Sequence, residues 1–259
     1  MNKTAIEWCD YTWNPVTGCL HGCPYCYARK IAERFKGTKA WPEGFKPTFH
    51  PERLNDPRKL GTQYYNAFPK GSTIFVCSMA DLFGDFIPYE WQHRVFDACM
   101  CSPRHTYIFL TKNPRGMETF LTRWSAEHHN MLDSDAEAFG RMWFGVSAGD
   151  RAYEGNYDPL VALYRVPSEN LFVSFEPLLV NIEAIYLDKK VKQVIIGAQT
   201  NPSETPYYSA IGEICKTSDR TGAKVFFKDS LLQFLPTTDK VRRELAWPLN
   251  KSTEPRHGA

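Results

Sequence analysis

Residues 11–35 read YTWNPVTGCLHGCPYCYARKIAERF: a short aromatic run, a loop with three cysteines and a segment of helical period follow one another. The cysteines Cys19, Cys23 and Cys26 have the spacing C-x3-C-x2-C. A cubane cluster has four irons, so three protein thiolates leave one iron open to an outside ligand. The spacing therefore predicts a [4Fe-4S] cluster to which a substrate or cofactor binds directly.

The third cysteine lies where a helix is predicted to begin, at residues 27–35. This segment places its apolar residues on one face, and Gly37 follows it. The helix dipole and the free amides of the first turn stabilise a negatively charged thiolate cluster. Gly18 and Gly22 let the preceding loop fold tightly around the irons.

Two other interpretations of the cysteines stay open. A structural zinc site needs four ligands, and His21 offers a fourth, although its place between Cys19 and Cys23 makes a shared tetrahedron cramped. Alternatively, the thiols are unrelated buried cysteines, which would not need this spacing.

Composition limits the class of protein. The chain has 259 residues, 43% of them hydrophobic, and a formal net charge of +2, which gives no strongly basic field. The amino terminus lacks the apolar stretch of a secretory signal, and no run approaches the ~18 apolar residues of a membrane span. Eight cysteines without a disulfide pattern suit a reducing compartment. We expect a cytoplasmic protein without a membrane segment.

Short runs of β-branched and aromatic residues recur along the chain and predict buried parallel strands. They are residues 11–13, 73–77, 106–110, 142–146, 171–175, 194–197 and 224–227. Segments of helical period separate several of them, beginning at Pro88 and Asn113 and ending before Gly222. This alternation predicts βαβ units, hence an α/β protein with a partial TIM-like (β/α)6-7 barrel and helices outside.

The predicted barrel domain spans residues 1–236. Within it, residues 38–72 are rich in turn formers and form an irregular insertion. Residues 237–259 are predicted to form a C-terminal helix and a polar tail.

Several motifs carry a family resemblance. The array C-x3-C-x-aromatic-C, with Tyr25 as the aromatic residue, resembles the signature of the radical S-adenosylmethionine (SAM) superfamily. In a fixed order from about Glu7 to Lys228, further motifs resemble the phage Gp37/Gp68-like proteins, also called DUF5131. They are TWNPVTGC at 12–19, CYA at 26–28, SMADLF at 78–83, LTK at 110–112, FGVS at 144–147, SFEPLL at 174–179 and FFK at 226–228.

Two positions depart from the family pattern. Related sequences have extra residues between the first two cysteines, whereas this chain keeps the three-residue gap of the superfamily. Where the related pattern reads Gly-Gly-Glu, this chain has Gly197-Ala198-Gln199, so no carboxylate for acid or base chemistry is expected at residue 199.

The resemblance implies an active site at the carboxyl ends of the barrel strands, as in other such barrels. SAM is expected on the open iron, where one electron from the reduced cluster cleaves it to a 5'-deoxyadenosyl radical. The cofactor performs the difficult chemistry, and the protein orients the reacting atoms.

The cofactor-binding residues expected from strand order and resemblance are Tyr25, Ser78, Asp81, Lys112, Ser147 and Gly197. Ser78 and Asp81 are expected near the methionine amino group, and Lys112 near its carboxylate. Ser147 is expected at the ribose hydroxyls. For each of these, a loop cap or solvated side chain is the alternative.

Three further residues are candidates for catalysis. Glu176 and Lys228 each follow a predicted strand; the alternative for Glu176 is a salt bridge to a barrel lysine such as Lys112 or Lys228. Cys77 follows the second strand and is a candidate hydrogen-atom donor, with a packing role as the alternative.

The substrate is not set by the sequence. Resemblance to phage proteins and to spore photoproduct lyases favours a nucleic acid or nucleotide, while a metabolite or peptide stays open. Candidate stacking and basic residues are Trp41, Phe45, Tyr64, Tyr65, Arg29, Lys30 and Arg34.

Two other classes of protein remain possible on the sequence. One is an iron-sulfur binding module or redox sensor without SAM cleavage, and the other is a zinc-stabilised nucleic-acid-binding protein. For an enzyme, cluster reduction implies a flavodoxin or ferredoxin-type electron donor. The oligomeric state is not predicted.

Overall fold

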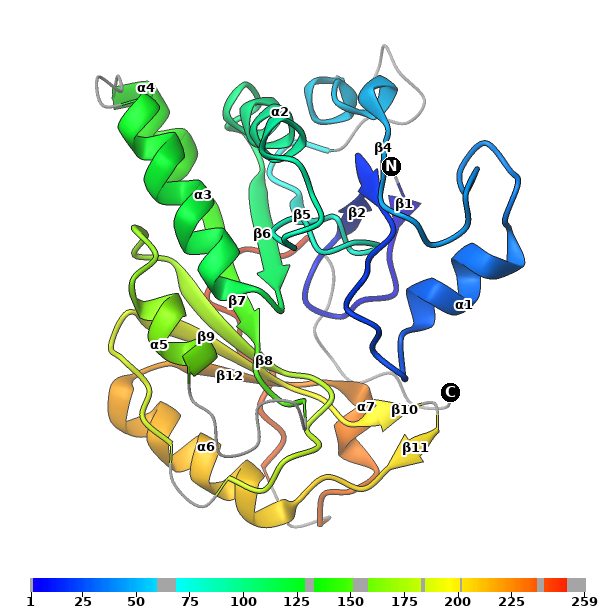
Figure 1. Cartoon of the computed structure of the whole chain (residues 1–259). Coiled ribbons are helices and arrows are strands. Elements are labelled where there is room, and N and C mark those ends of the chain that lie inside the picture. Colours follow the sequence, from blue (N-terminus) through cyan, green and yellow to red (C-terminus); the bar gives the residue numbers. More distant parts are fainter. Residues whose placement is uncertain are drawn as a thin grey trace.

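The computed structural model describes residues 2–59, 69–128, 133–150, 158–182, 185–200, 202–236 and 240–250 (Figure 1). Its main sheet has the strand order β1-β2-β5-β6-β7-β8-β9-β12. These strands are Asn2–Lys3, Tyr11–Trp13, Thr73–Val76, Thr106–Thr111, Met142–Ser147, Leu171–Phe175, Val191–Ile196 and Lys224–Phe227. In this part of the chain, β1 pairs antiparallel with β2, and all other neighbours in the sheet pair in parallel.

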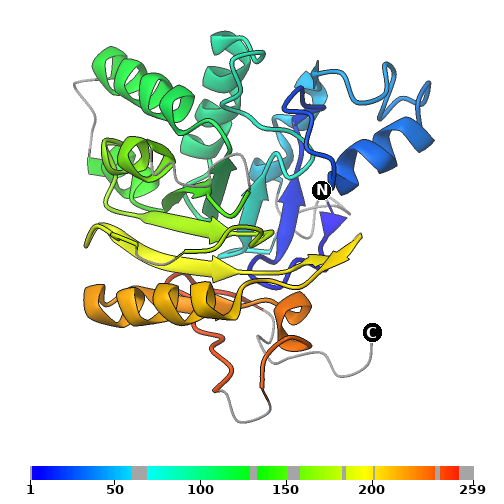
Figure 2. The same cartoon turned by 60° about the horizontal axis from the view of Figure 1, so that its bottom comes forward.

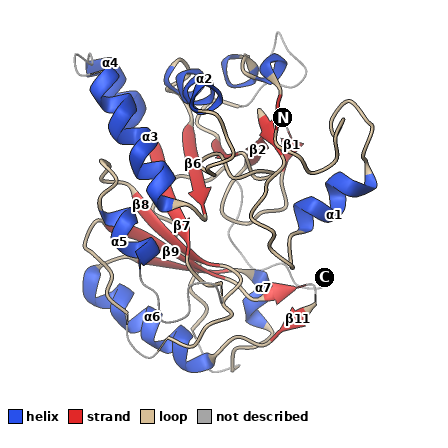
Figure 3. Ribbon diagram, in the orientation of Figure 1, coloured by secondary structure: helices blue, strands red, loops and turns tan. Residues whose placement is uncertain are grey.

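The seven parallel strands curl into a half-barrel with helices around it (Figure 1, Figure 2, Figure 3). This confirms the predicted partial TIM-like α/β fold. All seven predicted strands form, because their apolar runs are buried on both faces: every residue of β5, β7 and β8 is buried. Two small antiparallel pairs lie outside the main sheet: β3 (Val16–Thr17) with β4 (Thr48–Phe49), and β10 (Gln199–Thr200) with β11 (Ser203–Glu204).

The four predicted helices are present. They are α1 (Tyr27–Arg34), α2 (Tyr89–Met100), α3 (Pro114–Glu127) and α6 (Tyr208–Thr221). Asn113 caps α3, its Oδ1 accepting the Gly116 amide at 3.1 Å, and Gly222 ends α6 in the left-handed conformation. Three short helices were not predicted: α4 (Asp133–Phe139), α5 (Asp158–Tyr164) and α7 (Asp229–Leu232). None of the described helices is long and apolar enough to cross a membrane.

The half-barrel buries apolar side chains on both faces. On the face covered by helices, Phe109 and Phe144 stack at 5.4 Å between ring centroids and pack beside Phe96 of α2. The concave face has its own core, made of Trp8, Cys9, Phe75, Ile108, Trp143, Phe172, Ile195, Phe226 and Trp247. The interior of the half-barrel is therefore filled by large aromatic side chains, including two from outside the strands.

The predicted insertion, residues 38–72, is partly described. It contains β4 and two 3-10 turns, Pro51–Arg53 and Asp56–Arg58. Trp41 and Phe45 are buried against α1, so they form core there. Residues 60–68, which include Tyr64 and Tyr65, lie outside the described residues.

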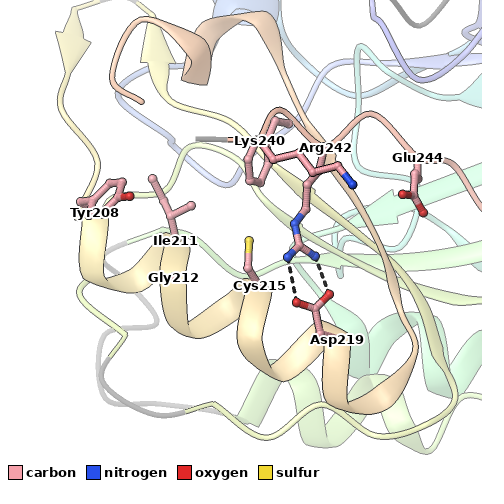
Figure 4. Close-up of a pocket in the computed structure, with 9 residues that line it drawn as sticks. Tyr208, Ile211, Gly212, Cys215, Asp219, Lys240, Arg242 and Glu244 are labelled. Carbon is pink, nitrogen blue, oxygen red and sulfur yellow. Dashed lines mark hydrogen bonds and ion pairs between the residues drawn. The ribbon is translucent and has the colours of Figure 1, made fainter. Parts of the chain in front are cut away.

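The segment after α7 forms turns and irregular structure where the structure describes it. Residues 240–250 contain no helix, so the helix expected after residue 237 is not found there. Arg242 donates two hydrogen bonds to Asp219 on α6, at 2.5 and 2.8 Å, and borders a pocket of about 390 Å³ (Figure 4). Trp247 Nε1 donates to the Trp8 carbonyl at 2.8 Å. These contacts hold the segment against α6 and the concave core.

A buried histidine makes the stability of the fold depend on pH. Burial, with the neighbouring Arg104 guanidinium, lowers the pKa of His105 from 6.5 to about 4. Between these two values the unfolded chain binds more protons, so the free energy of unfolding falls as pH falls. We expect a loss of about 3 kcal/mol from this residue by pH 4, following ~1.4 kcal/mol per pKa unit. Urea unfolding at pH 7 and pH 4 measures it, and His105→Gln should reduce the difference; an equal difference in both proteins would contradict the assignment.

Candidate functional site

A cavity of about 340 Å³ lies at the carboxyl ends of the parallel strands. The residues that follow neighbouring strands meet there, as barrel topology dictates. Of the sequence-predicted site residues, those lining it are Cys19, Cys23, Cys26, Tyr25, Ser78, Asp81, Lys112, Ser147, Glu176 and Lys228. The structure thus brings together side chains that are up to 209 positions apart, from Cys19 to Lys228.

The cysteine loop is held against the insertion and the end of β5. The amide of Gly18 donates to the Met79 carbonyl at 2.9 Å, and that of Cys19 to the Phe45 carbonyl at 3.1 Å. Gly18 has φ of +87°, and a Cβ there would meet the Lys46 carbonyl oxygen at 2.1 Å. Only glycine fits this close approach, which explains why the loop begins with one.

The three thiols share one wall of the cavity. Cys26 caps α1, its Sγ accepting the Arg29 amide at 3.4 Å. Burial raises the pKa of Cys19 to about 12, with additional contributions from Asp81 and the other two thiols. Burial also raises the pKa of Cys23. Three thiols that line one cavity, two of them with disfavoured thiolate forms, suit a cation as their common partner, so the donor set fits a metal centre whose binding releases protons.

Asp81 is the hydrogen-bonding hub beside the cysteine loop. Its Oδ2 lies 2.7 Å from His21 Nε2 and accepts the Lys112 amide at 2.8 Å. Its Oδ1 accepts the Thr111 hydroxyl at 2.6 Å and the Phe83 amide at 3.1 Å. Because protein donors engage both oxygens, Asp81 connects the cysteine loop to the end of β6.

A second polar group joins the loop to β7. The Tyr25 hydroxyl donates to Asp150 Oδ2, and Lys112 Nζ lies 2.9 Å from the Tyr25 oxygen and 3.1 Å from Asp150. Lys112 also lies 5.5 Å from the centroid of the Tyr25 ring, a cation-π distance. The ammonium group therefore lies on the cavity wall next to the cysteines, with its charge matched by Asp150.

Ser78 and Ser147, the two serines predicted at the site, make longer hydrogen bonds than Asp81 does. Ser78 Oγ donates to Asn14 Oδ1 at 3.2 Å, and Ser147 Oγ lies 3.4 Å from the Glu176 carbonyl oxygen. Asn14 Oδ1 also accepts the Met79 amide at 3.0 Å. Both hydroxyls thus retain acceptor capacity on the cavity side.

Glu176 and Lys228 form an ion pair that also lines the cavity. Lys228 Nζ donates to Glu176 Oε1 and lies 3.7 Å from Glu7 Oε2. Burial lowers the pKa of Lys228, but the two carboxylates outweigh it, so its pKa is raised above the ordinary value. Gly197 does not line the cavity; a Cβ there would lie 3.1 Å from Lys228 Cδ and 3.2 Å from Glu176 Cγ. Gly197 therefore makes room for the pair.

Cys77 lies apart from this group. It is 2% exposed, does not line the cavity, and has a left-handed φ of 56° at the end of β5. Burial raises its pKa to about 12. The structure places this thiol in the core that faces the helices.

Three polar side chains of the site are not predicted from the sequence in the roles they have. Glu7 lies near Lys228 and Asp150 pairs with Lys112, while His21, predicted only as a possible fourth zinc ligand, contacts Asp81. His21 Nε2 bonds Asp81, 60 positions away, and Asp150 pairs with residues 38 and 125 positions away. The sequence signal for Asp150 was its place just after β7, a strand already predicted.

Comparisons with known proteins agree with the observed fold. Spore photoproduct lyase complexed with dinucleoside spore photoproduct matches with a TM-score of 0.53 and 13% identity, over 88% of this chain and 79% of that chain. A double mutant of spore photoproduct lyase with bound AdoMet and dinucleoside spore photoproduct matches with a TM-score of 0.54 and 13% identity over the same shares. At these identities the likeness establishes the fold alone.

At the level of sequence, no curated protein matches significantly. One family model does match, DUF5131, described as a protein of unknown function, and it covers residues 3–242. Since this range is more than half of the sequence, the chain belongs to the DUF5131 family.

Proposed function

We propose that this protein is a radical SAM enzyme. The observation that carries the proposal is the convergence of three thiols and a set of polar side chains on one cavity at the carboxyl ends of a half-barrel. A half-barrel of similar fold, in spore photoproduct lyase, binds AdoMet. A closed structural zinc site would need four ligand atoms close together, and among the described residues the three thiols and His21 do not form such a group within 4.8 Å of one another.

In this proposal Cys19, Cys23 and Cys26 hold a [4Fe-4S] cluster with one open iron. When bound and reduced, such a cluster would supply the electron for cleavage of SAM to methionine and a 5'-deoxyadenosyl radical, the species that would abstract hydrogen from the substrate. The chain itself fixes the ligands: the Gly18 turn and the Cys26 cap set the loop, and Asp81 holds it through His21.

The polar side chains then have distinct tasks in binding SAM. The Lys112 ammonium, beside the cysteines, attracts the methionine carboxylate, and Tyr25 and Asp150 orient that lysine. Ser78 and Ser147 offer hydroxyls to the amino group and the ribose. Asp81 acts as a positioning residue, because its oxygens are engaged by protein donors.

We assign Glu176 and Lys228 to substrate binding, because this ion pair lines the cavity with one carboxylate and one ammonium group. Cys77 is left out of the active site, since it does not line the cavity. The dinucleoside bound by spore photoproduct lyase favours a nucleic acid or nucleotide substrate. A flavodoxin or ferredoxin-type protein is the proposed electron donor.

A test of this function needs no knowledge of the substrate. The full chain is loaded anaerobically with iron and sulfide, reduced with dithionite and given SAM, and 5'-deoxyadenosine is measured by liquid chromatography. We expect its formation to require both SAM and the reductant. A confirmed, reducible cluster that neither binds nor cleaves SAM would replace this proposal with the binding module or redox sensor.

A further inference from the structure

A second group of metal-ligating side chains lies on the helical layer, where it shares no residue with the cavity. One ligand atom from each of His93, Asp97 and His128 lies within 4.8 Å of the other two. His93 and Asp97 are one turn apart on α2, and His128 directly follows α3. The group therefore joins two helices that are separate in the sequence. All three residues are partly buried.

The first two side chains lie side by side in ion-pair contact. His93 Nδ1 and Asp97 Oδ2 are 2.9 Å apart. This separation is close to the ~3.3 Å between two ligand atoms on one tetrahedral ion whose bonds are ~2.0 Å long, so one ion can replace the shared proton. His93 Nε2 lies 3.8 Å from Glu127 Oε2, too far for a hydrogen bond, so Glu127 acts on the ring only through its charge.

The second histidine is held in the tautomer that a metal needs. His128 Nδ1 lies 2.8 Å from the Trp124 carbonyl oxygen, which only accepts hydrogen bonds. Nδ1 therefore carries the proton, and Nε2 presents a lone pair in the neutral ring. The ring also stacks on Trp124, with centroids 4.3 Å apart, which restricts its rotation.

Two hydrogen bonds hold the Glu127 carboxylate near His93. Tyr89 donates its hydroxyl to Glu127 Oε2 at 2.6 Å, and Arg123 Nε donates to Oε1 at 2.8 Å. The Arg123 guanidinium lies over the Tyr89 ring, 3.6 Å from its centroid. The Arg123 guanidinium is thus engaged by the Glu127 carboxylate and the Tyr89 ring.

From this geometry we propose that His93, Asp97 and His128 bind one divalent transition-metal ion, with Zn²⁺ as the best fit. Two imidazoles and a carboxylate are the ligands of open zinc sites, which keep a further position for water. The ion cross-links α2 to the end of α3. It binds independently of the cysteine cluster.

Zinc content tests the site directly. The full chain and the variants His93→Gln, His128→Gln and Glu137→Gln are dialysed against micromolar zinc, and metal per chain is counted by mass spectrometry. Glu137 is the matched control, an exposed carboxylate on α4 that pairs with Arg141 at 3.0 Å. We expect each histidine variant to lose one equivalent of zinc and the control to lose none. The test compares zinc content between the wild type and each variant, so any zinc bound by the cysteines contributes equally to both and is subtracted.

Thermal melting with and without zinc provides the second measurement. Zinc should raise the melting temperature of the wild type and the Glu137→Gln variant more than that of either histidine variant, because binding to the folded state stabilises it. Circular dichroism spectra of each variant are compared with that of the wild type to check that the variants are folded. Equal zinc content in wild type and both histidine variants would overturn the proposal. SAM cleavage should be unchanged in His128→Gln, which separates this inference from the proposed function.

Discussion

Cys23→Ser is expected to abolish 5'-deoxyadenosine formation and to leave the protein without a stable [4Fe-4S] cluster. The substitution replaces one of three thiols on the cavity wall by a hydroxyl, which is a poor iron ligand. Substitution of residues that hydrogen-bond a metal ligand typically lowers metal affinity or activity ~10- to 100-fold. Loss of a ligand itself should therefore lower the rate of 5'-deoxyadenosine formation by more than about 100-fold. Iron and sulfide per chain, the visible spectrum and 5'-deoxyadenosine are the measurements.

The matched control is Cys101→Ser. Cys101 is an exposed free thiol that follows α2, outside the cavity lining. It should keep cluster content and SAM cleavage at the wild-type level. If the Cys23→Ser protein retained a full cluster and cleaved SAM, these three cysteines would not be the cluster ligands.

Lys228→Met is expected to lower the free energy of unfolding by about 2–3 kcal/mol, less than the ~3–5 kcal/mol typical of a fully buried ion pair, because the Lys228 and Glu176 side chains are 16% and 27% exposed. Lys228 pairs with Glu176 and lies near Glu7, whose side chain is 9% exposed. Methionine keeps the length of the side chain but leaves two carboxylates close together with less compensation. Urea unfolding of the variant and the wild type measures the change.

A double variant separates charge from packing in this prediction. Glu176→Gln removes the carboxylate paired with Lys228, so adding it to Lys228→Met should recover a large part of the lost stability. Glu7 keeps a cationic neighbour, since Arg243 lies 3.7 Å away. If the double variant were as unstable as Lys228→Met alone, lost packing and not uncompensated charge would be the cause.

The fold could be predicted from the sequence because its strands carry apolar residues on both faces. Runs such as residues 106–110 and 171–175 stand out between polar segments, and each became a buried strand. The short helices α4 and α5, of seven residues each, span about two turns, too few to show a helical period.

The candidate site could be predicted only in part, because loops as well as strands position its side chains. Residues that directly follow strands, such as Lys112, could be placed because topology brings strand ends together. Their partners could not, because the pairing of Lys112 with Asp150 depends on the course of a loop. Trp41 and Phe45 show the converse: as exposed aromatic residues they would suit stacking, but the insertion folds back and buries them on α1.

Contacts between residues 8–10 and residues 247–250 join two parts of the chain that are synthesised far apart in time. Trp247 hydrogen-bonds the Trp8 carbonyl, and the Asn250 amide donates to Asp10 Oδ1 at 3.0 Å. Domains form while synthesis proceeds from the amino terminus. The cysteine loop is therefore translated more than 200 residues before the concave core that supports it is complete, from Cys26 to Trp247. The core that lines the inside of the half-barrel can consequently close only after Trp247 has been synthesised.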